Sequence, residues 1–193
     1  KAHQHSRLAT IESLGYAGGN EHFHKQEGIM RKFTVDEMLT AFQLEQLLYD
    51  YIEELDLNGS KNAGAFFTED GAFVTPGGSF VGPAAIQAFY DKRNENVAKY
   101  QKDGQRTSRH TFLNVRCHIH DADHATLFFT NVNYAAEGPA PATGLQGPSA
   151  VADCSMKYRR QNDGNWLIAE FRPSQALLGE DDFMKLMLSL ASK

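Results

Sequence analysis

The stretch SRHTFLNVRCHIHDADHATLFFTNVNYAA, residues 108–136, decides the fold. It holds two runs rich in β-branched and aromatic residues, 108–120 and 124–136, joined by the polar connection Asp121-Ala122-Asp123. Such a short connection joins antiparallel neighbours, because a parallel pair needs a crossover of a dozen residues or more. The stretch therefore predicts a long β-hairpin.

A second hairpin is predicted downstream. Residues 149–160 and 165–171 are again β-rich, and Asn162-Asp163-Gly164 joins them with turn-forming residues. Residues 137–148, between the two hairpins, contain three Pro and three Gly without alternation, which is typical of a long loop. The second half of the chain thus predicts four antiparallel strands.

The sequence before residue 106 predicts helices. Thr34-Val35-Asp36-Glu37 has the form of a capping box, and apolar residues at three- and four-residue spacing continue to a stop at Asn58-Gly59. A short helix over 63–67, a small hairpin over 72–81 and a helix that begins at Pro83 follow. The apolar positions expected on the first helix are Met38, Ala41, Phe42, Leu44, Leu48, Ile52 and Leu55.

This order predicts an α+β fold. An antiparallel sheet that curves around the N-terminal helices would form a cone, an α+β barrel with an interior that holds one small ligand. We expect an N-terminal arm over residues 1–33, a cone domain over 34–178, and a C-terminal helix within 179–193 that packs on the domain or on a neighbour.

Composition excludes several classes of protein. The 193 residues carry a net charge of -5, which does not favour nucleic acid as a partner. No apolar run reaches the length of a membrane span, and no secretory leader is recognisable, so we expect a soluble, cytoplasmic protein. The two cysteines, Cys117 and Cys154, lie in predicted strands and do not predict a disulfide framework.

Five short motifs occur in a recognisable order. They are Tyr51-x-x-x-x-Asp56, Phe66-Phe67-Thr68-Glu69-Asp70, Phe80-x-Gly82-x-x-x-Ile86, Thr107-x-Arg109-His110-x-x-x-Asn114 and Asp163-Gly164-x-Trp166. Across residues 44–172 they resemble the SnoaL-like branch of the superfamily named after nuclear transport factor two. Relatives include scytalone dehydratase, hexachlorocyclohexane dehydrochlorinase, ketosteroid isomerase, polyketide cyclases and the β subunits of ring-hydroxylating dioxygenases.

The resemblance implies a catalytic pair. In the two lyases an Asp that ends the first helix pairs with a His near the start of the first long strand, and those positions are Asp56 and His110 here. An imidazole suits a base near neutral pH, because its ordinary pKa is about 6.5 and a carboxylate at the other ring nitrogen fixes the tautomer. The alternative is a core histidine and a helix-end carboxylate.

Two positions depart from the dehydratase. Its tyrosine before the Asp is Leu55 here, and its second His falls at or near Ala152. The missing His argues against scytalone itself as the substrate. The phenol of the dehydratase is also missing, although Tyr51 could partly replace it.

Strand alternation extends the expected site. It places His110, Phe112, Asn114 and Arg116 on one face if no bulge intervenes, so Asn114 would share a cavity with His110. For the apolar candidates, plain core packing is the alternative. The residues expected to bind substrate are Tyr51, Phe112, Asn114, Phe129, Asn131, Cys154 and Tyr158.

A metal or another cofactor is not expected. His118, His120 and His124 cluster around a predicted hairpin tip, but such a tip is solvated and lacks the buried surroundings of a catalytic metal. A homo-oligomer, dimer or trimer, is expected, because alternation places Leu113, Val115 and Ile119 opposite Phe112 and so makes both sheet faces apolar.

The function expected from the resemblance is that of a cofactor-independent lyase, of dehydratase or dehydrohalogenase type, or an isomerase. Its substrate would be small, mostly apolar and cyclic. The alternative is a non-catalytic ligand-binding or assembly module similar to the dioxygenase β subunits.

Overall fold

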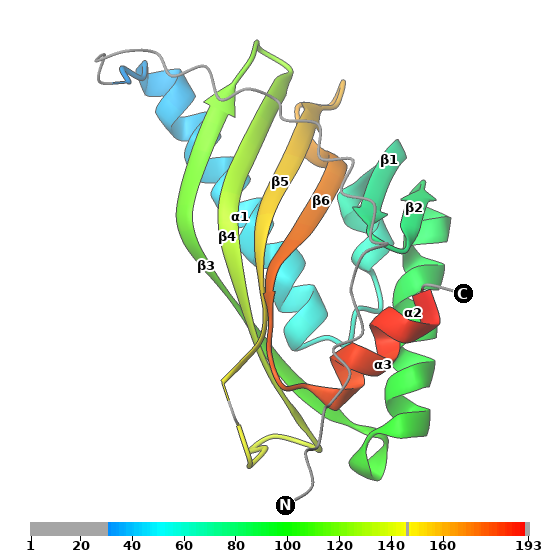
Figure 1. Ribbon diagram of the computed structural model, residues 1–193. Helices are drawn as coiled ribbons and strands as arrows, with labels where there is room; N and C mark the ends of the chain where they lie inside the picture. Colours follow the sequence, from blue (N-terminus) through cyan, green and yellow to red (C-terminus); the bar gives the residue numbers. More distant parts are fainter. Residues whose placement is uncertain (1–30, 146, 192–193) are drawn as a thin grey trace, which may run out of the picture. The chain divides into compact units, whose positions relative to one another are not determined.

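The computed structural model describes residues 31–145 and 147–191. The expected N-terminal arm, 1–33, falls almost entirely outside the described residues. Within them, one six-stranded sheet has the order β2-β1-β6-β5-β4-β3 and curves around α1 (Figure 1). The helical elements are α1 (Val35–Asp56), η1 (Ala63–Phe66), α2 (Pro83–Tyr100), η2 (Lys102–Gly104) and α3 (Asp182–Ala191). The strands are β1 (Phe67–Thr75), β2 (Gly78–Val81), β3 (Arg106–Ile119), β4 (His124–Glu137), β5 (Pro148–Arg160) and β6 (Trp166–Leu178).

The predicted α+β fold and both predicted hairpins are confirmed. β3 pairs antiparallel with β4, and β5 with β6. One pair departs from the expected antiparallel arrangement, because β1 runs parallel to β6. This pair joins strands about a hundred residues apart, so no local turn signal could reveal it. None of the described helices is long and apolar enough to cross a membrane.

The capping box starts α1 as predicted. The Thr34 hydroxyl accepts a hydrogen bond from the Glu37 backbone N–H at 3.2 Å, and the Glu37 carboxylate accepts one from the Thr34 N–H at 2.6 Å. The apolar face is buried only from Leu44 onward, whereas Met38 and Phe42 are 52% and 60% exposed. The first turns of α1 therefore lie beyond the core that the sheet encloses.

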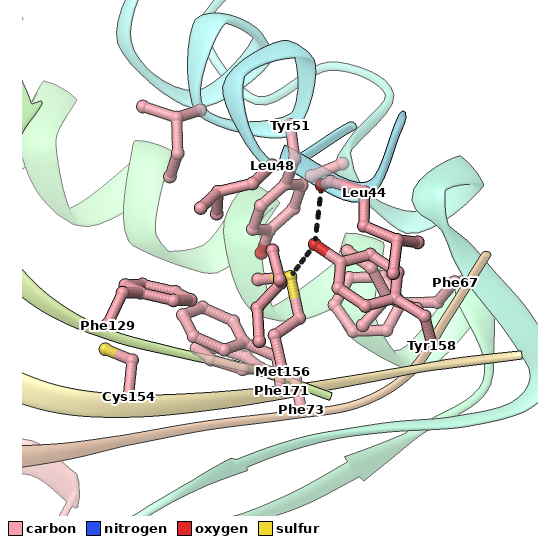
Figure 2. Close-up of a cluster of buried hydrophobic side chains, with 14 of the residues drawn as sticks. Leu44, Leu48, Tyr51, Phe67, Phe73, Phe129, Cys154, Met156, Tyr158 and Phe171 are labelled. Atoms are coloured by element: carbon pink, nitrogen blue, oxygen red, sulfur yellow. Dashed lines mark hydrogen bonds between the residues drawn. The ribbon is translucent and has the colours of Figure 1, made fainter. Parts of the chain in front are cut away.

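Aromatic side chains fill the space between α1 and the sheet (Figure 2). The Tyr51 ring makes edge contacts with Phe67 and Phe171. The Tyr158 hydroxyl has two acceptors for its one proton, Met156 Sδ at 2.8 Å and the Leu44 carbonyl oxygen at 3.5 Å (Figure 2). Edge-to-face ring contacts and hydrogen-bonded hydroxyls are typical of a densely packed aromatic core.

A β-bulge interrupts β3. Leu113 pairs with Thr130 and Arg116 with Phe128, so two residues of β3 oppose one of β4. Asn114 takes the left-handed conformation with φ 56°, which asparagine tolerates better than most residues. The bulge reverses the alternation that holds before it.

The bulge overturns two expectations. Asn114 is exposed and lies at the bulge, so the plain alternation that would place it in a cavity with His110 does not hold there. Val115 and Ile119 pack against the same core as Phe112 instead of facing away from it. The argument that both faces of the sheet are apolar therefore fails for β3.

The core makes a stability prediction. Leu48 is fully buried, and Leu48→Ala is expected to lower the free energy of unfolding by about 2–5 kcal/mol, through lost burial and the cavity left behind. Leu39→Ala is the matched control on the same helix, because Leu39 is 58% exposed and its truncation costs roughly 0.5 kcal/mol or less. Urea unfolding measures both, and equal losses would contradict the assignment of the buried face.

Candidate active site

His110 and Asp56 meet where α1 ends against β3. Asp56 is the last residue of α1, and its Oδ1 lies 2.7 Å from His110 Nδ1. Both side chains are shielded, with 6% of Asp56 and 14% of His110 exposed. The two residues that the resemblance pairs are thus in direct contact, through a shielded hydrogen bond.

Three further donors surround Asp56. Its Oδ2 accepts the backbone N–H of His110 at 2.7 Å, and its Oδ1 accepts the Ser108 hydroxyl at 3.1 Å. The Arg109 guanidinium donates to its backbone carbonyl at 3.3 Å. Burial pushes the pKa of Asp56 up, but the hydrogen bonds from His110 and Ser108 outweigh it and hold the pKa below its ordinary value. Asp56 is therefore an anionic acceptor.

The carboxylate fixes the tautomer of His110. Because Asp56 accepts at Nδ1, that nitrogen carries a proton, and Nε2 of the neutral ring is the acceptor. Nε2 lies 2.6 Å from the amide nitrogen of Asn133, which donates to it. Asn133 was not among the expected site residues. Alternation along β4 could have found it, because Phe129, Asn131 and Asn133 project to one face of the strand.

Asn131 and Asn133 lie side by side with the expected site on the concave face. Asn133 pairs with His110 and Asn131 with Phe112 across the β3–β4 ladder. The next strand places Ala152 beside Asn131, and β6 places Gln175 beside Ala152. Among the described residues, the buried amide oxygens of Asn131, Asn133 and Gln175 have no hydrogen-bond partner. The surroundings of His110 are thus more polar than the expected apolar interior.

The other expected binding residues lie deeper. Tyr51, Phe129, Cys154 and Tyr158 are all buried in the aromatic core. The Tyr51 hydroxyl is hydrogen-bonded to that of Tyr90 on α2. Burial raises the pKa of Cys154 to about 12, so its thiol is protonated and is no nucleophile. Contact between these four residues and a substrate stays a prediction.

Other histidines and hollows lie away from the pair. His124 Nδ1 contacts Asp121 Oδ1 at 2.9 Å on the exposed β3–β4 turn, and no group of three or more potential metal ligands occurs in the part of the chain described here. Two open hollows have volumes of about 480 and 500 Å³, one at this turn and one between β4, the segments 143–144 and 147–148, and α3. Neither is lined by His110 or Asp56.

A family model described as SnoaL-like domain matches residues 36–172, which is more than half of the chain. The chain belongs to the SnoaL-like domain family. The matched segment begins at the second residue of α1, ends within β6, and contains both Asp56 and His110. A search of curated proteins finds no match for this SnoaL-like chain.

Solved structures share the fold of this SnoaL-like domain. ActVI-ORFA from Streptomyces coelicolor has a TM-score of 0.60 at 17% identity, over 71% of this chain and 98% of that chain. A proposed scytalone dehydratase from Novosphingobium aromaticivorans has a TM-score of 0.58 at 14% identity, over 75% of this chain and 89% of that chain. At these identities the likeness establishes the fold, and activity has to be argued from the site.

The lowered pKa of Asp56 predicts how acid destabilises the fold. A carboxyl group whose pKa is lower in the folded state contributes stability above its unfolded value, here 3.8, and loses that contribution as the pH falls toward its folded pKa. The difference in unfolding free energy between wild type and Asp56→Asn is therefore expected to shrink below about pH 4. Urea unfolding between pH 6 and pH 3 measures it. A difference that stays constant with pH would contradict the assigned role of the carboxylate.

Proposed function

We propose that this SnoaL-like protein is a cofactor-independent lyase or isomerase in which His110 is the general base and Asp56 its orienting partner. The observation that carries the proposal is the shielded contact of Nδ1 with Asp56, which leaves Nε2 as the basic nitrogen on the concave face. A hydrogen-bonded carboxylate stabilises the imidazolium that forms when Nε2 takes a proton.

The chemistry follows from that nitrogen. Nε2 removes a proton from a carbon next to a carbonyl or a leaving group, and Asn133 gives up its hydrogen bond to Nε2 as the substrate enters. The electron pair of the broken C–H bond forms a new double bond. In an elimination it expels halide, after which His110 releases its proton to solvent, or it expels hydroxide, which takes the proton from His110 and leaves as water. In an isomerisation the proton returns from His110 to another carbon.

The surroundings favour a small ring that carries oxygen. Phe112 lies beside His110 on β3 and makes an edge contact with Phe129, with ring centroids 5.1 Å apart, so it offers an apolar surface for a ring. Asn131 and Asn133 offer amide groups for a hydroxyl or carbonyl substituent. We therefore propose a mostly apolar cyclic substrate with at least one oxygen substituent.

A panel assay tests the reaction. The protein is incubated in D2O with cyclic β-hydroxyketones, chlorinated cyclohexanes and β,γ-unsaturated cyclic ketones, which report dehydration, dehydrohalogenation and isomerisation. Proton NMR follows the product and the uptake of deuterium. His110→Ala is expected to lower the rate by roughly 10²–10⁴, and Asp56→Asn should also lower it, since it loses the orienting carboxylate.

The control is a second histidine with a carboxylate partner. His124 also contacts an aspartate, Asp121, but on the exposed turn, so His124→Ala should leave turnover unchanged. Full activity of His110→Ala would refute His110 as the base. Absence of turnover across the whole panel would favour the binding or assembly module.

A further inference from the structure

Arg93 is a cation on the inward side of α2. It lies three residues after Tyr90, four after Phe89 and four before Val97, in the middle of the apolar face of the helix. Its side chain is half-buried. A charged residue on such a face is costly, because desolvating a guanidinium requires compensating partners.

The protein offers only weak partners for the charge of the Arg93 guanidinium. Among the described residues, no carboxylate oxygen lies within 4.0 Å of the Arg93 guanidinium. Its recorded hydrogen bond goes to the side-chain oxygen of the neighbouring Asn94, at 3.5 Å. Arg106, whose side chain is 6% exposed, contrasts with it, because Arg106 pairs directly with Asp181.

Hydrogen bonds hold this part of α2 beside the end of α1. Asn94 Nδ2 donates to the Gly59 carbonyl at 2.8 Å, and Gln87 Nε2 donates to the Ser60 carbonyl at 2.8 Å. Gly59 and Ser60 closely follow Asp56. Tyr90, about one turn before Arg93 on the same face of α2, is hydrogen-bonded to Tyr51 of α1, so this face of α2 is turned toward α1. Burial and nearby Arg106 lower the pKa of Arg93, whereas nearby Tyr90 and Asp56 raise it.

We propose that Arg93 binds a ring-borne oxyanion of the substrate, a phenolate or the enolate of a cyclic ketone, next to the His110–Asp56 pair. The proposal rests on the proposed function and deepens it. When Nε2 takes a proton from the carbon next to a carbonyl, the electron pair moves onto the carbonyl oxygen, and Arg93 neutralises the negative charge that develops there. The unpaired amide oxygens of Asn131, Asn133 and Gln175 would accept hydroxyl protons of the same ring.

A pair of chromogenic probes tests the site without any turnover. 4-Nitrophenol is used at a pH at which it is ionised, and 4-nitroanisole is its uncharged counterpart. Binding of each to wild type, Arg93→Met, Arg93→Lys and Lys92→Met is followed by absorbance. Lys92→Met is the matched control, because this substitution removes one positive charge from the adjacent, exposed position of α2.

The expected result is a selective loss of phenolate binding in Arg93→Met. Arg93→Met should bind 4-nitrophenolate roughly tenfold more weakly or worse, the effect of one charge-assisted hydrogen bond, and should bind 4-nitroanisole like wild type. Arg93→Lys should retain part of the affinity, and Lys92→Met all of it. The thermal midpoint of Arg93→Met should equal or exceed that of wild type, because an apolar side chain replaces a poorly paired, half-buried charge.

Three outcomes would overturn the proposal. They are no phenolate binding by wild type, unchanged phenolate binding by Arg93→Met, and an equal loss of both probes in that variant. If Arg93→Met does not fold, Arg93→Gln takes its place. An inactive protein that still shows Arg93-dependent phenolate binding would refute the lyase or isomerase reaction alone, so the two failures are distinguishable.

Discussion

The packing of α1 against β3 depends on the hydrogen bonds that the Asp56 carboxylate accepts. β3 is an edge strand of the sheet, so one side of its backbone has no neighbouring strand. Asp56 accepts the His110 backbone N–H on that strand while it also accepts the Ser108 hydroxyl and the His110 ring nitrogen. One side chain at the end of α1 thereby ties the helix to β3. The same contact sets which nitrogen of His110 is basic.

Polar groups continue from that contact through an otherwise aromatic interior. The hydroxyls of Tyr51 and Tyr90 are hydrogen-bonded to each other between α1 and α2, and Arg93 follows Tyr90 on the inward face of α2. The two tyrosine hydroxyls need no other hydrogen-bond partner. Strong partners within the described chain are lacking for Arg93 and for the amide oxygens of Asn131 and Gln175. Groups of this kind cost stability in the free protein, and such a cost is typical of sites shaped for a ligand.

Local sequence patterns predicted most of the helices and strands. The Thr34–Glu37 capping box fixed the start of α1, and the polar turns 121–123 and 162–164 fixed the two long hairpins. Each of these signals acts between residues close in sequence. The parallel pairing of β1 with β6 was not predicted, because pairing between distant strands leaves no pattern in either strand alone. The bulge at Asn114 was not predicted either, and its one extra residue reverses the direction of every later side chain in β3.

The sequence by itself determined the α+β class, the family resemblance and the pairing partners Asp56 and His110, because a motif preserves residue type and spacing. Only the tertiary structure decided what surrounds that pair. Asn133 came to face Nε2 through the register of β3 against β4, and Arg93 came to lie near the end of α1 through hydrogen bonds from Gln87 and Asn94. These neighbours are set by packing across elements, where side-chain direction depends on register and bulges and not on the local order of residues.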